Sequence, residues 1–251
     1  MFLAHKEDVV LAPSPRPRFL LPLHRAGFAI PQFASDREEL GERELGELLP
    51  WGWSPKASQT LRRPWNKELA CLYDKTWAFE QRLRFLEAHD DPILLREESA
   101  IFTDKEAILR RISQGGNWVL KRPFSTSGKG RILLREPVEE RSERWIEKQL
   151  KNGPLLVEPW HQRIADFSIQ TEIRDDRIQI LGKTRFWTAA TGAYRGALLG
   201  PWTLGLEADT VRALQQAGAS TLLDQAARQV ARAAQQKGYR GPLGVDAMAV
   251  Q

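Results

Sequence analysis

Residues Val119–Leu134 read VLKRPFSTSGKGRILL, and this stretch decides the fold. Two apolar runs, each typical of a buried strand, enclose a segment of small residues that includes Ser127, Gly128 and Gly130. Lys121 ends the first run. Because glycine lacks a Cβ and hydroxyls can donate hydrogen bonds, such a hairpin tip can close over phosphate oxygens. We expect a strand, a lid and a second strand, with the Lys121 ammonium beside the phosphates; an exposed, solvated turn is the alternative.

The spacing in this stretch excludes two common phosphate-binding motifs. A P-loop needs a glycine where Pro123 stands and a hydroxyl residue where Gly130 stands. The glycine loop G-x-G-x-x-G of kinases and dinucleotide-binding proteins fails because Leu133 occupies its last glycine position. A lid between two strands therefore remains.

Composition limits the classes of protein that need to be considered. The formal charge of +5 leaves nucleic acid, an anionic membrane surface or a phosphorylated ligand open as partners. The basic residues alternate with acids instead of forming a stripe, which argues against nucleic acid. No window approaches the roughly 20 apolar residues of a membrane span. The single cysteine, Cys71, excludes an internal disulfide framework, and we expect a cytoplasmic location.

A second stretch, LLVEPW at residues 155–160, carries a carboxylate on an apolar run. Glu158 ends this run and Trp160 follows the proline, an arrangement typical of a hinge whose backbone can pair with an adenine edge. Asp166 begins the next expected strand, where its carboxylate can accept hydrogen bonds from ribose hydroxyls. For each acid, a surface turn is the alternative reading.

Three further stretches supply charged candidates. Lys183 and Arg185 alternate in LGKTRFW and so share one face of a strand, which favours a single anionic target over two solvated side chains. Arg195 lies between glycines in a predicted loop, where its guanidinium can approach a carboxylate or phosphate. Asp246 lies within the apolar run LGVDAMAV and needs a cation or hydrogen-bond partners, so we interpret it as a magnesium ligand.

The order of VLKRPFSTSGKGRILL, LLVEPWHQRIADFSIQTEI and GYRGPLGVDAMAV resembles the ATP-grasp superfamily. The resemblance covers about residues 74–251 and implies an α+β fold, with a lid subdomain at about 90–155 and a C-terminal subdomain at about 156–251. The expected strand, helix and strand at 8–12, 19–27 and 28–33, followed by a helix over 35–50, make residues 1–73 similar to a small α/β pre-ATP-grasp domain.

The resemblance also implies roles for the candidates. Lys121 matches the lysine before the lid, and Ser127, Gly128 and Gly130 match the lid tip. Glu158 and Trp160 match the adenine side of the hinge, Asp166 the ribose side, and Asp246 a ligand of Mg²⁺. The implied activity is an ATP-dependent ligase that joins a small-molecule carboxylate to an amine through an acyl phosphate. Lys183, Arg185 and Arg195 would stabilise charge during phosphoryl transfer.

One departure from the family pattern concerns the end of the sequence. The family carries a further Glu and Asn beyond the aspartate strand, whereas this sequence stops at Gln251. We expect a C-terminally truncated chain from a longer ligase. The alternatives are a catalytically degenerate nucleotide-binding module, a kinase-like phosphotransferase and a basic nucleic-acid-binding protein. A homodimer is consistent with the sequence.

Overall fold

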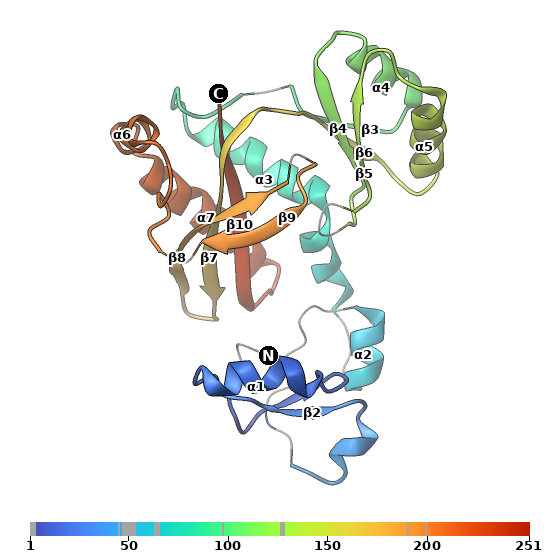
Figure 1. Cartoon of the computed structure of the whole chain (residues 1–251). Helices are drawn as coiled ribbons and strands as arrows, with labels where there is room; N and C mark the ends of the chain where they lie inside the picture. The colour runs from blue at the N-terminus through green and yellow to red at the C-terminus, as the bar shows by residue number, and fades with distance from the viewer. Residues whose placement is uncertain are drawn as a thin grey trace. The chain divides into compact units, whose positions relative to one another are not determined.

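The computed structural model describes residues 4–44, 46, 54–62, 66–96, 98–125, 129–189, 191–198 and 200–251, and Figure 1 shows its helices and strands. The chain divides into two compact units, Met1–Lys67 and Glu68–Gln251. The boundary that we expected, after residue 73, lies a few residues further along. None of the helices among these residues is long and apolar enough to cross a membrane.

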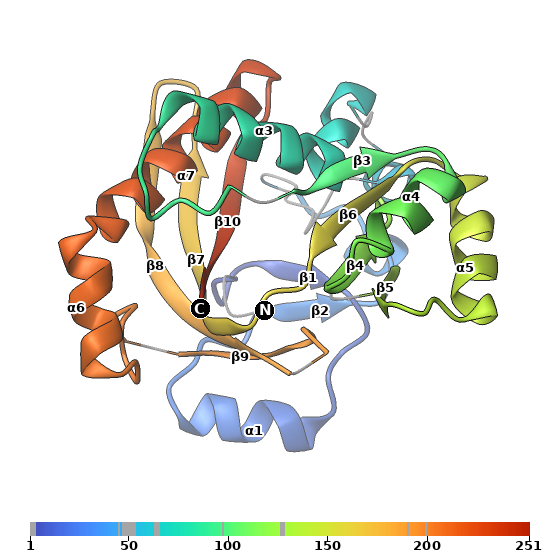
Figure 2. The ribbon, with the colours of Figure 1, turned by 90° about the horizontal axis from the view of Figure 1, so that it is seen from above.

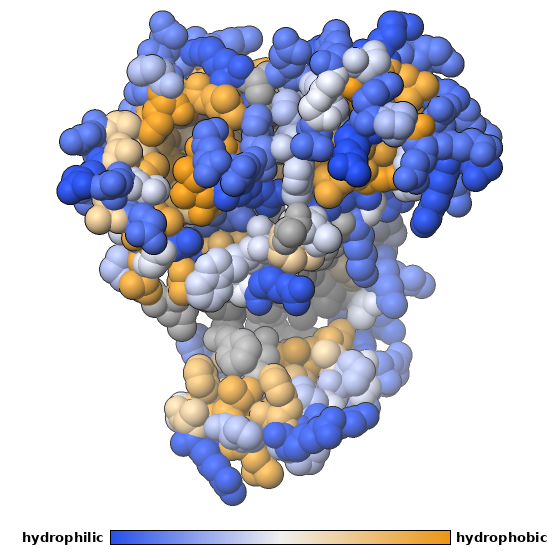
Figure 3. Space-filling model, turned by 45° about the horizontal axis from the view of Figure 1, so that its top comes forward, coloured by the Kyte–Doolittle hydropathy of each residue, from blue (hydrophilic) through white to orange (hydrophobic). Residues whose placement is uncertain are grey.

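The first unit contains the predicted strand, helix and strand. Strand β1 (Val9–Leu11) pairs in parallel with β2 (Gln32–Ala34), and α1 (Pro17–Arg25) connects them. Pro17 is suited to the first turn of α1, where its missing N–H would have no partner. Figure 3 shows hydrophobic residues at the surface of this unit, and α1 exposes Phe19 and Leu21.

The predicted helix over 35–50 is wrong for the part that the structure describes. Only a short 3₁₀ helix, η1 (Glu38–Leu40), forms there, and residues 45 and 47–50 lie outside the described ranges. Helix α2 (Pro55–Leu61) follows, and the Ser54 hydroxyl caps it by accepting a hydrogen bond of 3.1 Å from the Ala57 backbone N–H.

The second unit begins with η2 (Lys67–Tyr73) and α3 (Lys75–Ala88). The Asp74 carboxylate caps α3 by accepting a hydrogen bond of 2.7 Å from the Thr76 backbone N–H. A four-stranded antiparallel sheet follows, which we call the lid sheet, with the strand order β3-β6-β4-β5. Its strands are β3 (Ala100–Phe102), β4 (Asn117–Lys121), β5 (Arg131–Arg135) and β6 (Leu155–Pro159).

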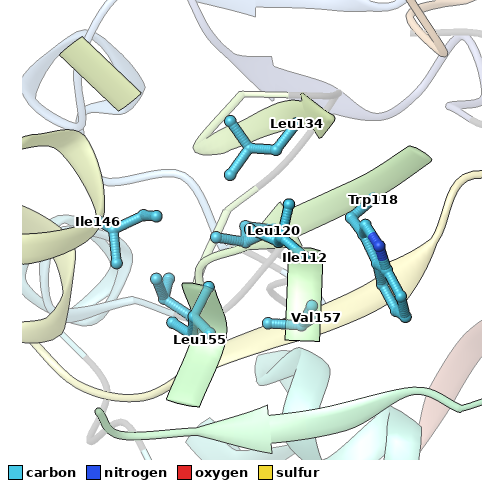
Figure 4. Packing of buried hydrophobic residues seen from close by; sticks show 8 residues of the cluster. Ile112, Trp118, Leu120, Leu134, Ile146, Leu155 and Val157 are labelled. Carbon is cyan, nitrogen blue, oxygen red and sulfur yellow. The ribbon is translucent and has the colours of Figure 1, made fainter. Parts of the chain in front are cut away.

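Helices α4 (Lys105–Ile112) and α5 (Glu140–Leu150) cover one face of the lid sheet. Figure 4 shows the apolar side chains of both helices packed against those of the strands. Because side chains alternate along a strand, Trp118 and Leu120 of β4 enter this core, while Val119 and Lys121 point to the opposite face. Each fully buried isoleucine or leucine in the cluster stabilises the fold by about 1.5–3 kcal/mol.

A second antiparallel sheet, the C-terminal sheet, has the strand order β10-β7-β8-β9. It contains β7 (Arg163–Ile173), β8 (Ile178–Thr188), β9 (Tyr194–Leu198) and β10 (Gly241–Val250). Helices α6 (Ala208–Gln216) and α7 (Ala219–Gln236) lie between β9 and β10 in the chain, and Gly218 separates them with a φ of +62°.

Helix α7 packs on one face of the C-terminal sheet and lies beside α3 (Figure 2). Three alanines of α7, Ala227, Ala231 and Ala234, are fully buried, and the last two contact Ile173 of β7. Small side chains allow the helix to approach the sheet closely. The other face of this sheet carries the even-numbered residues of β10, which are exposed from Pro242 to Met248.

Candidate functional site

Two of the predicted residues, Lys121 and Glu158, form an ion pair on the face of the lid sheet that α4 and α5 leave uncovered. Strands β4 and β6 pair with Val119 opposite Glu158 and Lys121 opposite Leu156, so the two charged side chains are diagonal neighbours. Their side chains are 27% and 18% exposed, which limits the access of water to the pair. The structure therefore brings the lid lysine and the hinge acid together.

Two further cations, Lys75 and Arg122, lie next to this ion pair. The Lys75 ammonium donates a hydrogen bond of 2.7 Å to the Ser125 hydroxyl and a second bond to the Ser125 carbonyl. Burial lowers the pKa of Lys75, the charges of Lys121 and Arg122 lower it further, and Asp74 and Glu158 oppose the change. Three cations thus lie with only two carboxylates, Asp74 and Glu158, and this excess of positive charge favours an anionic ligand.

Lys75 was missed in the sequence analysis, although the sequence contains one signal of it. It is the first residue of α3, directly after the N-cap Asp74. A cation is unfavourable at a helix N-terminus because the helix dipole is positive there. A lysine at this position therefore indicates that a contact elsewhere favours it. That contact is the hydrogen bond to Ser125, which lies 50 residues further along the chain.

The base of the lid is described by the structure, whereas its tip is not: Ser127 and Gly128 lie outside the described residues. Gly130 has a φ of +65°, and its backbone carbonyl accepts a hydrogen bond of 3.0 Å from the Arg122 N–H. A Cβ at Gly130 would lie 2.5 Å from Arg122 Nε and 2.9 Å from Ser125 Cβ. Only glycine therefore allows the Arg122 guanidinium to lie against the lid backbone.

Trp160 lies in the linker between β6 and β7, as predicted, and its backbone N–H donates a hydrogen bond of 2.7 Å to the Asn117 carbonyl. The guanidinium carbons of Arg163 and Arg131 lie 4.4 Å and 5.8 Å from the centroid of its ring. Arg131, on β5, also donates a hydrogen bond to the Thr191 carbonyl in the connection between β8 and β9. The lid sheet and the C-terminal sheet thus make contact at the linker.

Asp166 is buried in β7 beside this linker. Its carboxylate accepts a hydrogen bond of 2.7 Å from the Thr188 hydroxyl and lies 3.6 Å from Arg163 Nη1. A cavity of about 280 Å³ opens there, lined by residues 160–166 and 185–189. A carboxylate at the edge of such a cavity can accept hydrogen bonds from a ligand hydroxyl.

Asp246 lies on the same face of the C-terminal sheet as Asp166. Asp246 is opposite Ser168, and Asp166 is opposite Met248, so the two acids occupy diagonal positions on neighbouring strands. Partial burial raises the pKa of the Asp246 carboxyl, the hydrogen bond with Ser168 opposes this, and the nearby charge of Asp166 adds to it. Within the ranges that the structure describes, no three His, Cys, Asp or Glu side chains gather as a metal site.

The side-chain contacts of the remaining three candidates lie elsewhere, although Arg185 is among the residues that line the cavity beside Asp166. Lys183 and Arg185 share a strand face, as predicted, but this is the face that α7 covers. Lys183 Nζ lies 2.7 Å from the Asp224 carboxylate of α7, and Arg185 Nη1 donates a hydrogen bond of 2.7 Å to the Leu204 carbonyl. The structure does not bring them to Lys121 or Asp246. Arg195 is exposed in strand β9, so the predicted loop is wrong at this position.

Comparisons with known proteins give structural matches only. No family model and no curated protein matches the sequence. The structure is similar to that of carboxyaminoimidazole ribonucleotide synthase from Aspergillus clavatus complexed with ATP, with 14% identity and a TM-score of 0.50 over 98% of this chain and 67% of that chain. This likeness shows the ATP-grasp fold and confirms the predicted α+β class.

Two other solved structures match with similar values. D-alanyl-alanine synthetase A from Vibrio cholerae is 13% identical, with a TM-score of 0.49 over 78% of this chain and 57% of that chain. N5-carboxyaminoimidazole synthetase from Staphylococcus aureus complexed with ADP is 11% identical, with a TM-score of 0.49 over 72% of this chain and 42% of that chain. This chain therefore spans about two fifths to two thirds of the lengths of these proteins.

Proposed function

We propose that this chain, which has the ATP-grasp fold, binds ATP with Mg²⁺ between the lid sheet and the C-terminal sheet. We further propose that it belongs to a ligase that joins a carboxylate to an amine. One observation carries the proposal: three cations, Lys75, Lys121 and Arg122, lie near one another at the base of a glycine-containing lid, with only two carboxylates, Asp74 and Glu158, beside them. Such a cluster lacks negative charge, and the phosphates of ATP would supply it.

In this proposal the triphosphate lies beside Lys121, and Lys75 and Arg122 add positive charge on either side. The lid tip, with Ser127 and Gly128, would close over the phosphates, and Gly130 allows its base to turn. The three cations offset the charge that develops on the transferred phosphoryl group. The closed lid would exclude water from the reacting atoms.

The nucleoside would lie at the linker between the two sheets. Glu158 can accept a hydrogen bond from an exocyclic amine, and Trp160 offers an aromatic face beside the 280 Å³ cavity. Asp166, at the edge of the same cavity, would accept hydrogen bonds from ribose hydroxyls. When ATP binds, Lys121 would have both Glu158 and a phosphate as partners.

Asp246 would hold the metal ion. Asp246 lies on the open sheet face, and carboxylate oxygens suit Mg²⁺. The nearby charge of Asp166, which contributes to the raised pKa of Asp246, favours a cation at this position. The ion would neutralise charge on the phosphates and complete its coordination with phosphate oxygens and water.

The proposed reaction begins when a substrate carboxylate attacks the γ-phosphorus of ATP, which forms an acyl phosphate and releases ADP. An amine then attacks the acyl carbon, an amide bond forms, and phosphate leaves. Arg195 is the candidate for orienting the carboxylate, because its exposed guanidinium can bind two oxygens at once. Lys183 and Arg185 take no part in the proposed chemistry. Lys183 pairs with the Asp224 carboxylate of α7, and Arg185 donates a hydrogen bond to the Leu204 carbonyl.

Calorimetric titration with MgATP tests the nucleotide site. We expect Lys121→Met to weaken binding by about tenfold or more, since a charge-assisted hydrogen bond contributes about 1.5–3 kcal/mol. Lys151→Met, which removes an exposed lysine at the end of α5, is the matched control and should bind as the wild type does. Equal affinity of the two variants would rule out the proposed position of the triphosphate.

A second assay tests the reaction class. ADP release would be measured across panels of carboxylates and amines, with hydroxylamine added to trap an acyl phosphate as its hydroxamate. Trapped hydroxamate with a single carboxylate would support the ligase reaction. ATP binding without ADP release on any panel would instead support a nucleotide-binding module, and a phosphorylated hydroxyl product would support a kinase-like transfer.

A further inference from the structure

We propose that a groove between α3 and α7 is a second ligand site, which takes a small polyanion with two or more phosphate or carboxylate groups. The groove has a volume of about 500 Å³, and four basic side chains line it: Arg84, His89, Arg228 and Arg232. It lies on the side of α7 that faces away from Asp166 and Asp246. The proposal therefore does not depend on the nucleotide site.

The sequence of α7 explains why the arginines point into the groove. Ala227, Ala231 and Ala234 form the fully buried stripe that packs on the C-terminal sheet. Arg228 and Arg232 follow two of these alanines directly, so they lie about 100° around the helix from the buried stripe. Both are exposed, and they are one helical turn apart. Arg84 approaches from α3, which lies beside α7 in Figures 1 and 2.

The floor of the groove is held in place by contacts between and within its elements. The Gln229 side-chain amide of α7 donates a hydrogen bond of 3.2 Å to the Gln81 carbonyl of α3, and Gln81 is only 2% exposed. The His89 ring stacks on Phe85 with a centroid distance of 4.1 Å. A ligand would therefore meet a groove that is already formed, so little ordering would be needed for binding.

The charges of the groove are uncompensated by protein groups. Of the residues that the structure describes, no acid lines the groove, and Arg84, Arg228 and Arg232 make no ion pair with any of them. Asp224, one turn before Arg228, forms an ion pair with Lys183 of the C-terminal sheet. Three guanidiniums thus line one groove without a counter-charge, although Arg228 Nη1 also donates a hydrogen bond of 3.4 Å to the Ile178 carbonyl. A guanidinium can bind a phosphate or carboxylate through two parallel hydrogen bonds.

The size and surroundings of the groove favour a small molecule over a nucleic acid. Its volume falls within the roughly 300–1,000 Å³ that small-molecule sites occupy. Glu80 and Glu87 lie on α3 near the groove without lining it, so the positive charge does not extend into a stripe. Among the described lining residues, no Phe, Tyr or Trp is present for nucleobases to stack on.

Titration of pyrophosphate into the full chain, followed by calorimetry without Mg²⁺ at low ionic strength, tests this site. The Lys121→Met background weakens competing binding at the nucleotide site. In that background, we expect Arg84→Gln/Arg228→Gln/Arg232→Gln to lower pyrophosphate affinity by about tenfold or more. The control, Arg110→Gln/Arg135→Gln/Arg141→Gln, removes three exposed arginines outside the groove and should stay within about twofold.

Each outcome decides the proposal. Equal pyrophosphate affinity of the groove and control variants would overturn it, as would binding of a dT₁₂ oligonucleotide that pyrophosphate fails to displace. The groove variant in an otherwise wild-type chain should bind MgATP normally, which separates this site from the proposed function. If the triple variant fails to fold, the wild-type arginine Nε–Hε NMR signals remain: pyrophosphate should shift those of Arg84, Arg228 and Arg232, and unchanged signals would refute the site.

Discussion

The Lys121 ammonium and the Glu158 carboxylate pair across β4 and β6, on the face of the lid sheet that its two helices leave uncovered. Neither group lies in the hydrophobic core, yet both are more than two-thirds buried. Lys75 lies close enough to feel the charges of both Lys121 and Glu158. Substitutions of Lys121 or Glu158 therefore test the charges at the base of the lid without changing the hydrophobic core of the lid sheet.

We expect Lys121→Met and Glu158→Gln to destabilise the fold, each by about 1–2 kcal/mol, because each leaves a partly buried charge without its partner. The loss of unfolding free energy in the double variant should be smaller than the sum of the losses in the two single variants. Urea unfolding of the four proteins measures this coupling energy. Additive losses would mean that the two side chains do not interact in solution.

A second prediction concerns Gly130, where two effects of an added Cβ can be separated. Gly130→Ala would place a Cβ 2.5 Å from Arg122 Nε at a φ of +65°. Gly218 has nearly the same φ, +62°, but nothing within 4 Å of an added Cβ. Gly218→Ala should therefore cost about 1 kcal/mol from backbone strain alone, while Gly130→Ala should cost about 1–3 kcal/mol more through overpacking.

Thermal unfolding of both variants gives the comparison. Gly130→Ala should also weaken MgATP binding, because Arg122 must move away from the lid base. A Gly130→Ala variant that is no less stable than Gly218→Ala would show that the guanidinium moves aside at no cost, and that the lid does not depend on this contact.

The sequence predicts a candidate residue of the site when the pattern that marks the residue lies among its neighbours in the sequence. Lys121, Gly130 and Glu158 were found because each sits at a break in an apolar strand pattern. Lys75 was missed because the group it contacts, Ser125, is distant in sequence. Its position at a helix N-terminus was the single local indication.

The sequence also does not predict which face of a sheet a helix covers. Alternation predicted that Lys183 and Arg185 share a face, but it does not say which face a helix covers. That depends on the register of β7 and β8, in which Ile169 is opposite Lys183 and Phe167 is opposite Arg185. A shift of one residue would have turned both cations to the open face. Arg195 differs again, since pairing with β8 outweighed the flanking glycines that suggested a loop.

A third prediction uses the raised pKa of Asp246. Because the folded-state pKa lies above the unfolded value of 3.8, the folded protein binds the proton more strongly. The unfolding free energy contributed by this group therefore falls as the pH rises from 3.8 through the raised pKa, and it stays low above that pH. Asp246→Asn removes this loss, so the variant should be more stable than the wild type at neutral pH.

Urea unfolding at several pH values checks the sign: the advantage of Asp246→Asn should shrink as the pH falls. Asp166→Asn is the contrasting variant. Thr188 and Arg163 both contact the Asp166 carboxylate, so removing this carboxylate should destabilise the fold. MgATP affinity should fall in Asp246→Asn despite its greater stability. An unchanged affinity would argue against Asp246 as the metal ligand.

The last prediction compares Lys121 with Lys183, the two lysines that the sequence analysis expected beside the phosphates. Lys183 is 14% exposed and pairs with Asp224 of α7, so Lys183→Met should lower the unfolding free energy by about 1–3 kcal/mol. It should leave MgATP affinity within about twofold of the wild type, whereas Lys121→Met should lose tenfold or more. Asp224→Asn should reproduce the loss of stability, because it breaks the same ion pair. If Lys183→Met instead kept its stability and lost nucleotide binding, the ion pair with α7 would not be its role, and the C-terminal sheet would have to present this lysine to the phosphates.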